Sequence, residues 1–269
     1  MRKIYILLLF PVLLLTSCEE IFEYHPNQIR LRDSEKNLTQ RNINRIQQQT
    51  PGDTLRLVVM GDTQRFYDDA EDFVKAVSAM EGVDFVVHQG DISDFGLAKE
   101  FRWVHDIMKR LPVPYLTVIG NHDMMSNGKD VYQQMYGDMN YAFVYGKVKF
   151  IFIDTNGREY RFNGKVPDVG WLQRQLTPTP EDTWEQAVII SHMSPFGSDY
   201  DGKLRLPFQQ ALEQSGRVQL SLHGHEHNWE FYQPEEGNVT YQITTSMNNR
   251  GFSYIKIWSD GFKIQRVHY

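Results

Sequence analysis

The sequence predicts an α/β fold of four layers, in which two mixed sheets pack together and helices cover their outer faces. From Leu55 onward, short apolar runs alternate with segments of helical periodicity, which is the pattern of strands and helices packed in layers. The apolar runs are nearly continuous, as expected of strands that are covered on both faces. The end of the chain is rich in predicted strands. These strands would add to the sheets that the alternating strands and helices form.

The first part of the predicted domain begins after the turn signal Pro51-Gly52-Asp53. Residues 42–49, before this turn, predict a short helix. Apolar residues at helical spacing predict two longer helices, and the apolar runs between them predict strands. The expected elements are, in order, strand 55–60, helix 69–81, strand 84–88, helix 97–111 and strand 115–119.

The second part contains a hairpin, two further core strands and a strand-rich end. Gly146-Lys147 is the expected turn of the hairpin. A helix near Pro207 is predicted between the two core strands, with the proline in its first turn. Asp260-Gly261 predicts the turn of the last hairpin. The expected strands are 141–145, 148–153, 187–191, 218–223, 239–244, 252–258 and 262–267.

The start of the chain has the pattern of a secretory signal. Arg2 and Lys3 precede an uncharged apolar run over residues 4–15. As a helix this run would reach about 18 Å, short of the ~30 Å hydrocarbon core of a bilayer. The run ends in Leu-Thr-Ser-Cys at residues 15–18, which resembles a bacterial lipobox, where the cysteine is acylated and the preceding peptide is removed. The alternatives are a soluble secreted protein with a free cysteine, or an uncleaved anchor.

These signals divide the chain into three predicted parts. Residues 1–17 would be a signal peptide, residues 18–27 a tether, and residues 28–269 a single domain. Acyl chains on Cys18 would supply about 0.8 kcal/mol for each buried methylene, so they would hold the protein at a membrane without a spanning helix. The predicted location is the cell envelope, on the periplasmic side of a membrane or at the cell surface.

The composition excludes several classes of protein. The chain has 269 residues, 23% of them charged and 41% hydrophobic, which is typical of a globular protein and not of a disordered one. A net charge of −6 argues against a nucleic-acid surface, because phosphate backbones favour a clustered basic stripe. One cysteine excludes an intrachain disulfide and a Cys-rich zinc module, so the nine histidines direct attention to His/carboxylate metal chemistry. No protein partner is predicted.

Five polar clusters each follow a predicted strand. Because the carboxyl ends of strands in an α/β sheet meet at one crevice, side chains far apart in sequence can meet there. Each cluster alone is weak evidence, since an Asp after a strand often caps a helix and Asn-His is common in loops. Together they supply the oxygen and imidazole ligands of Zn, Mn and Fe sites. The clusters are Gly61-Asp62-Thr63-Gln64, Gly90-Asp91-Ile92-Ser93-Asp94, Gly120-Asn121-His122-Asp123, Ser191-His192 and Gly224-His225-Glu226-His227.

This set of oxygen and imidazole ligands suits two divalent metal ions, since one carboxylate can bridge a pair of them. Two cations ~3.5–4 Å apart would clamp a phosphoryl group and lower the pKa of a bridging water, giving hydroxide near neutral pH.

The ordered motifs GDTQ, GDISD, GNHD, SH and GHEH resemble those of the calcineurin-like metallophosphoesterase family, from about Leu55 to His227. The resemblance implies the family's fold and a metal-dependent hydrolase of phosphate mono- or diesters, in which a hydroxide bridging two metals attacks phosphorus. It also implies that His122 protonates the leaving oxygen and that Asp94 orients it, although Asp94 could be an ordinary solvated carboxylate. By position, the first metal would be held by Asp62, Gln64, Asp91 and His227, and the second by Asp91 as the bridge, Asn121, His192 and His225.

One position departs from the family pattern. The first motif is usually Asp-x-His, and here the third residue is Gln64. Its carbonyl oxygen is harder than imidazole nitrogen and a poorer donor, so the first site should favour Mn, Fe or Mg over Zn. Gln64 could ligate directly, bind through water or position a substrate. It is the only feature that favours the alternative function, a catalytically weak or inactive metal-binding module tethered at the surface.

Overall fold

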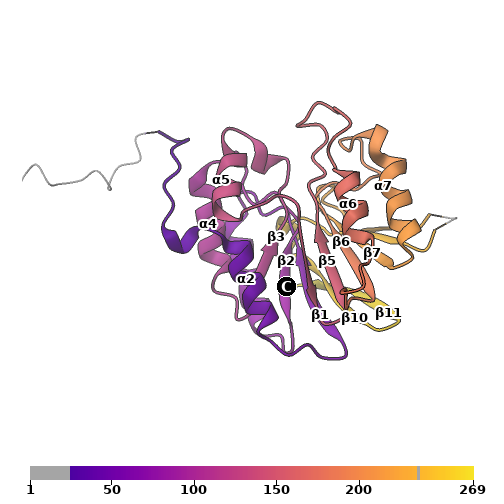
Figure 1. Cartoon of the computed structure of the whole chain (residues 1–269). Helices are drawn as coiled ribbons and strands as arrows, with labels where there is room; N and C mark the ends of the chain where they lie inside the picture. Colours follow the sequence, from indigo (N-terminus) through magenta and orange to yellow (C-terminus); the bar gives the residue numbers. More distant parts are fainter. Residues whose placement is uncertain (1–24, 235–236) are drawn as a thin grey trace, which may run out of the picture.

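Two mixed sheets form the centre of the molecule, and helices cover both outer faces (Figure 1). The computed structural model describes residues 25–234 and 237–269, so the predicted signal peptide and Cys18 lie outside the described residues. Among the described residues no helix is long and apolar enough to cross a bilayer. The predicted four-layer α/β/β/α arrangement is confirmed.

The first sheet has the strand order β11-β10-β1-β2-β3. Strands β1, β2 and β3 run parallel, with β3 at one edge of the sheet. Strand β10 pairs antiparallel with β1 and forms a hairpin with β11. Alternate residues of β1 face opposite sides, with Leu57 in the core between the sheets and Val58 under the outer helices. The strands are β1 (Leu55–Met60), β2 (Phe85–His88), β3 (Tyr115–Thr117), β10 (Gly251–Trp258) and β11 (Gly261–His268).

The second sheet has the strand order β4-β5-β6-β7-β9-β8. The four inner strands run parallel, and β4 and β8 pair antiparallel at the two edges. A parallel bridge between Gly61 and Ser246 joins the ends of β1 and β9, so the carboxyl ends of both sets of parallel strands lie at one edge. The strands are β4 (Tyr141–Tyr145), β5 (Val148–Phe152), β6 (Gln186–Ile190), β7 (Val218–His223), β8 (Glu230–Tyr232) and β9 (Thr240–Ile243).

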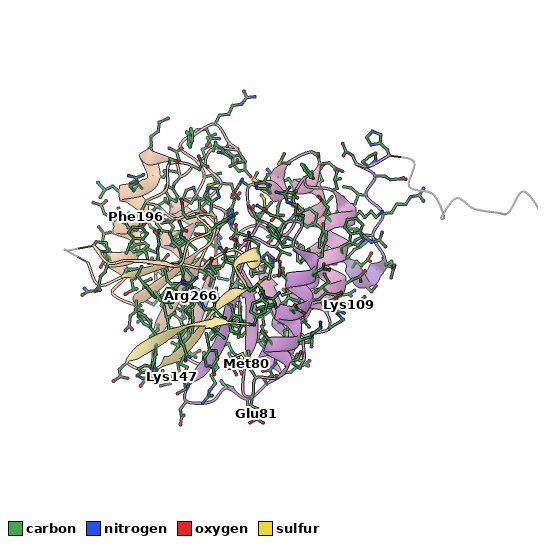
Figure 2. The ribbon with its side chains drawn as sticks, turned by 180° about the vertical axis from the view of Figure 1, so that it is seen from behind. Met80, Glu81, Lys109, Lys147, Phe196 and Arg266 are labelled. Atoms are coloured by element: carbon green, nitrogen blue, oxygen red, sulfur yellow. The ribbon has the colours of Figure 1, made fainter. Side chains whose placement is uncertain are left out.

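The helices lie on two sides of this sandwich, as Figure 1 shows. Helices α3, α4 and α5 pack on the first sheet, and α6 and α7 pack on the second. Helix α2 places Ile43 and Ile46 in the core between the sheets. Viewed from behind (Figure 2), Glu81 and Lys147 lie at the lower edge, away from Phe196, which follows β6. The helices are α2 (Leu38–Gln47), α3 (Tyr67–Ser78), α4 (Ala98–Met108), α5 (Gly128–Met135), α6 (Val169–Leu176) and α7 (Gly202–Ser215), with short 3₁₀ turns η1 (Asp33–Glu35), η2 (His122–Met124) and η3 (Met247–Asn249).

Two helix predictions are wrong in detail. The helix predicted over residues 42–49 begins earlier, because α2 spans Leu38–Gln47. Pro207 lies inside α7 and not in its first turn. The helix begins earlier because the Asp201 side chain caps it, accepting a hydrogen bond from the Lys203 backbone N–H. The short elements α5, α6 and β8 were not predicted, since none of them carries a long apolar stripe or run.

An aromatic cluster fills the space between the two sheets. Phe85 of the first sheet is fully buried, and its ring packs edge-to-face on Phe143, Tyr145 and Phe150 of the second. The ring centroids of Phe85 and Phe150 are 5.1 Å apart, within the range of favourable aromatic pairs. This cluster therefore fixes one sheet against the other.

We expect Phe85→Ala to lower the free energy of unfolding by about 3–5 kcal/mol, because it removes a buried ring and leaves a cavity between the sheets. Urea denaturation followed by circular dichroism measures the change. The control is Leu206→Ala, on a side chain that is 61% exposed, and it should change stability by less than about 0.5 kcal/mol. Equal effects of the two substitutions would contradict a core that joins the sheets through Phe85.

Candidate metal centre

The five polar clusters of the sequence meet at the edge where the parallel strands of both sheets end. They follow β1, β2 and β3 in the first sheet and β6 and β7 in the second. Backbone hydrogen bonds connect neighbouring clusters: Asp62 N donates to Gly90 O at 2.9 Å, and Gly224 N donates to His192 O at 2.9 Å. The predicted ligand side chains are therefore gathered in one region.

Five of the seven predicted metal ligands have a left-handed backbone conformation. Ten non-glycine residues in the described part of the chain have positive φ, so half of them belong to this site. Such a conformation costs on the order of 1–3 kcal/mol for each residue and persists where the surrounding structure imposes it, typically at functional sites. The five are Asp62 (φ 54°), Gln64 (φ 44°), Asp91 (φ 53°), His225 (φ 71°) and His227 (φ 56°).

Glycines allow the loops of the site to touch. Gly90 has a φ of +92°, and a Cβ atom added there would lie 2.8 Å from His192 Nδ1. A Cβ atom on Gly120 would lie 2.2 Å from Asp91 Oδ1. No larger residue fits at either position without moving a ligand side chain, so these glycines set the spacing of the site.

His192 presents one ring nitrogen to two oxygen acceptors. Its Nδ1 lies 2.7 Å from the Gln89 carbonyl oxygen, which can only accept, so Nδ1 carries a proton. Its Nε2 lies 3.0 Å from Asn121 Oδ1 and 3.3 Å from Asp91 Oδ1. The two oxygens need a positive charge beside them, which a proton on Nε2 supplies and a bound cation in its place would also supply, so this arrangement fits a cation site.

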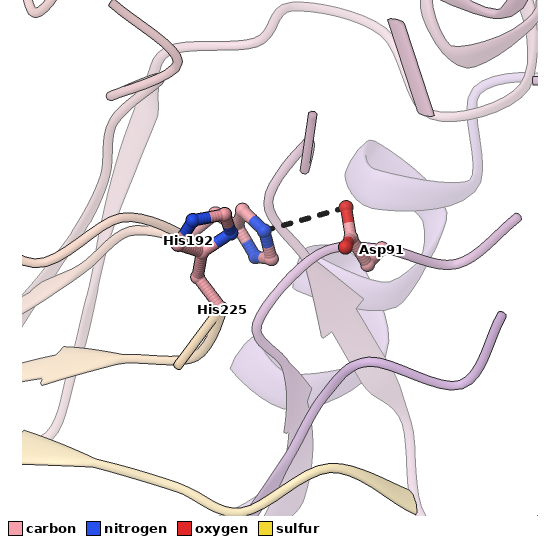
Figure 3. Close-up of side chains that lie close together, drawn as sticks. All are labelled: Asp91, His192 and His225. Atoms are coloured by element: carbon pink, nitrogen blue, oxygen red, sulfur yellow. Dashed lines mark ion pairs between the residues drawn. The ribbon is translucent and has the colours of Figure 1, made fainter. Parts of the chain in front are cut away.

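The pKa values of His192 and Asp91 also indicate that this buried site favours positive charge. Burial lowers the pKa of His192, but the Asp91 carboxylate outweighs burial and raises it to about 10. Burial tends to raise the pKa of Asp91, and the charge and hydrogen bond of His192 hold it far below its usual value. His225 completes a group of three whose ligand atoms lie within 4.8 Å of one another, and Figure 3 shows these side chains converging.

A second group of donors surrounds Asp62. This carboxylate is fully buried, and among the described residues its Oδ1 accepts no hydrogen bond, although it lies 3.3 Å from His227 Nε2. Its Oδ2 accepts a hydrogen bond from the His225 backbone N–H at 3.2 Å. An oxygen of a buried carboxylate without a hydrogen bond is costly, so Asp62 also fits a cation ligand.

Asp91 lies between the two groups. Its Oδ1 faces His192 Nε2, and its Oδ2 accepts a hydrogen bond from Gln64 Nε2 at 3.3 Å. The Gln64 backbone N–H also donates to Asp91 O at 3.0 Å, which fixes the Gln64 side chain beside the carboxylate. The oxygen and nitrogen donors present fit a pair of divalent cations, with Asp91 in the position of a shared ligand.

His122 borders the donor groups and is one-third exposed. Its backbone N–H donates to Asp91 Oδ1 at 2.9 Å. Its Nδ1 lies 2.8 Å from the backbone carbonyl oxygen of Asp94, whereas the Asp94 carboxylate is 3.5 Å away and accepts a hydrogen bond from Arg65 Nη1. Asp94 therefore contacts the ring through its main-chain oxygen as well as its charge.

Two carboxylates were not singled out by the sequence analysis. Asp123 is buried and accepts hydrogen bonds from the backbone N–H groups of Gly120, Ile92 and Ser93, which ties two of the loops together. Burial and the charge of Asp91 raise the pKa of Asp123 to about 7. Asp123 ends the GNHD motif, so its position was a usable signal.

Asp199 is the second of these carboxylates. Its Oδ2 lies 3.2 Å from His225 Nε2 and accepts a hydrogen bond from Arg158 Nη1 at 2.8 Å. No motif surrounds Asp199 in the sequence, so only the folded structure reveals that it contacts a candidate ligand.

Comparison with known proteins extends these observations. The sequence profile described as calcineurin-like phosphoesterase matches residues 55–229. A curated relative from Arcobacter nitrofigilis, named "Probable glycerophosphodiester phosphodiesterase GpdQ", is 25% identical over 118 residues. The match covers 42% of this chain and 42% of that protein, so the chain spans about two fifths of the length of the curated relative it matches.

Solved structures share the fold at low sequence identity. A dimetal phosphatase from Danio rerio has a TM-score of 0.65 at 15% identity, covering 80% of this chain and 97% of that one. The purple acid phosphatase PPD1 from yellow lupin (Lupinus luteus) has a TM-score of 0.64 at 14% identity, covering 82% and 52%. GAP50, the anchor in the inner membrane complex of Plasmodium, has a TM-score of 0.60 at 17% identity, covering 80% and 84%.

The profile match covers more than half of the chain and contains all seven predicted ligand positions. The resemblance seen in the sequence motifs is therefore confirmed, and the chain belongs to the calcineurin-like phosphoesterase family.

Proposed function

We propose that this protein hydrolyses phosphoesters with two divalent cations, and that its seven clustered donors hold them. The position of Asp91 carries the proposal, because its two carboxylate oxygens face different donor groups. Membership of the calcineurin-like phosphoesterase family supports metal-dependent phosphoester hydrolysis in general. The proposed ligands are Asp62, Gln64, Asp91 and His227 for the first cation, and Asp91, Asn121, His192 and His225 for the second.

When bound, the cations would polarise the phosphoryl oxygens and make hydroxide available near neutral pH. We propose Mn, Fe or Mg in preference to Zn at the first site, because the amide oxygen of Gln64 is a harder donor than imidazole. A Gln64 carbonyl turned toward the cation would still leave its amide N–H₂ free to bond to Asp91.

His122 is the proposed general acid. Its Nδ1 donates to the Asp94 carbonyl oxygen, so Nε2 is the atom that can give a proton to the departing oxygen. The Asp94 carboxylate, 3.5 Å from Nδ1, would stabilise the doubly protonated ring that this role requires. The Asp91 contact to the His122 backbone N–H fixes the loop on which the ring stands.

Small phosphate mono- and diesters are the proposed substrates. The curated relative is named a glycerophosphodiester phosphodiesterase, which supports testing diesters alongside monoesters. We propose a lipid-anchored location in the cell envelope, through acylated Cys18. The alternative, a binding module without catalysis, rests on Gln64 alone, because every other ligand position retains a metal-binding residue type.

The purified full chain should hydrolyse p-nitrophenyl phosphate or its bis-ester with added Mn²⁺, lose activity in EDTA and regain it with metal. Asp91→Asn should reduce the metal content measured by plasma mass spectrometry below two ions per chain, because the shared carboxylate is lost. Asp138→Asn, on an exposed aspartate, is the matched control and should keep both ions. Absence of turnover with Mn²⁺, Fe²⁺, Mg²⁺ and Zn²⁺ over a panel of mono- and diesters would favour the binding module.

We expect His122→Asn to reduce turnover by on the order of 10²–10⁴-fold with metal content retained, as for loss of a general acid. The loss should be larger for an alkyl phosphate than for p-nitrophenyl phosphate, because an alkoxide needs protonation more than a phenolate. His268→Asn is the control, since His268 is exposed and distant in sequence from the motifs. Loss of metal, or an equal loss for both leaving groups, contradicts the assignment.

Gln64→His should raise the affinity for Zn²⁺ relative to Mn²⁺, because imidazole is a softer and stronger donor than an amide oxygen. Competition titrations with a chromogenic chelator give the two affinities for the wild type and the variant. Gln134→His introduces the same residue at an exposed position of α5 and should leave the ratio unchanged. An unchanged ratio in Gln64→His means that Gln64 does not contact the cation directly.

A further inference from the structure

Three exposed apolar side chains lie in the loops after β2, β3 and β5, and the loops after β2 and β3 also carry candidate metal ligands. Phe95, Met125 and Phe162 are 52%, 45% and 36% exposed, and we refer to them as the apolar rim. Phe95 directly follows Asp94, and Met125 is the residue after the 3₁₀ turn η2 (His122–Met124). Single exposed apolar residues are common, but here two adjoin His122 and a third lies in the turn that carries Arg158, so the three together need a physical explanation.

The rim has members on both sides of the metal centre. The loops of Phe95 and Met125 touch, since a Cβ atom on Gly96 would lie 2.1 Å from Met125 O. Both adjoin His122. Phe162 belongs to the loop after β5, which is tied to the His225 side through the contact of Arg158 with Asp199.

Basic side chains stand among the apolar ones. Arg65 contacts Asp94 and Arg158 contacts Asp199, and both arginine side chains are at least half exposed. Apolar residues combined with arginine and lysine are typical of protein surfaces that lie in the interface of a bilayer, where rings enter the headgroup region and cations meet lipid phosphates.

The chain enters the fold beside this rim. The Asn27 carbonyl oxygen accepts a hydrogen bond of 2.7 Å from Asn127 Nδ2, two residues after Met125. Figure 1 shows the first described residues, in indigo, level with the upper end of the molecule near α5, while the β10 and β11 labels stand at the lower end. The N-terminal connection is therefore made at the end of the molecule that carries the metal centre.

The tether is too short for the opposite orientation. Nine residues separate Cys18 from Asn27, and a fully extended chain spans at most about 3.3–3.6 Å for each, so about 30 Å in all. A domain of this length is roughly 45 Å across, from its expected radius of gyration of about 18 Å. A lipid on Cys18 would therefore exclude the fully inverted orientation, because that orientation would need a longer tether.

We propose that the anchored protein docks on the bilayer through the apolar rim, so that the metal centre faces the lipid surface and takes phosphoesters of lipid headgroups. The proposal rests on the proposed function for its substrate class and on acylation of Cys18 for its orientation. Its docking part stands on the rim, the tether and the acylation of Cys18, and not on catalysis, so it can be tested without measuring hydrolysis.

The test places one fluorescent reporter on the rim of the full, lipidated chain. Cys18 is the only cysteine and its thiol is blocked when acylated, so Met125→Cys offers a single site for the label NBD. Trp258→Cys is the matched control, because Trp258 is 37% exposed and lies at the β10–β11 turn, at the opposite edge of the sheet. Phe162→Cys is a second rim reporter on the other side of the centre.

The protein is bound to vesicles of phosphatidylethanolamine and phosphatidylglycerol and recovered by flotation. The labels at 125 and 162 should shift to the blue, brighten several-fold and be quenched by lipids that carry a nitroxide, while the label at 258 stays unchanged. Equal responses at all three positions, a response at 258 alone, no response, or failure to float each overturn the proposal. A correct fluorescence pattern in a protein without hydrolase activity would instead reject the proposed function and keep the docking surface.

Discussion

Burial of negative charge is the constraint on which the whole site depends. Asp62 and Asp91 are almost completely buried where the two sheets end, and a buried carboxylate is stable only beside compensating positive charge or hydrogen-bond donors. His192 supplies part of that charge to Asp91, and His227, whose Nε2 lies 3.3 Å from Asp62 Oδ1, is the nearest cationic group to that oxygen among the described residues. Five of the proposed ligand residues also have a left-handed backbone, a strained conformation that persists where the surrounding structure imposes it, typically at functional sites.

The two sheets carry different members of the proposed ligand set. Asp62, Gln64, Asp91 and Asn121 follow strands of the first sheet, and the proposed histidine ligands follow strands of the second, so the site depends on the relative position of the sheets. The aromatic cluster around Phe85 lies in the core between the sheets and fixes that position. The geometry of the proposed ligands at the edge of the sheets therefore depends on the packing of this cluster in the core.

The sequence predicted much of this arrangement, and the misses have physical reasons. Strand β1 was predicted with its observed bounds, because its nearly continuous apolar run is a clear signal, whereas the start of α7 depended on the cap at Asp201. The candidate ligands were found because each follows a strand. The contact of the Asp94 main-chain oxygen with His122, and that of Asp199 with His225, could not be predicted, since they depend on loop paths that no periodicity encodes.

Asp199 also connects an exposed loop to one of the candidate metal ligands. Its Oδ2 is shared by Arg158, on an exposed loop, and by the ring of His225. Because a hydrogen bond to the outer nitrogen of an imidazole sets its orientation and basicity, a change in the loop alters the donor strength of His225. A change in this loop that moves Asp199 would therefore also alter the proposed metal site at His225.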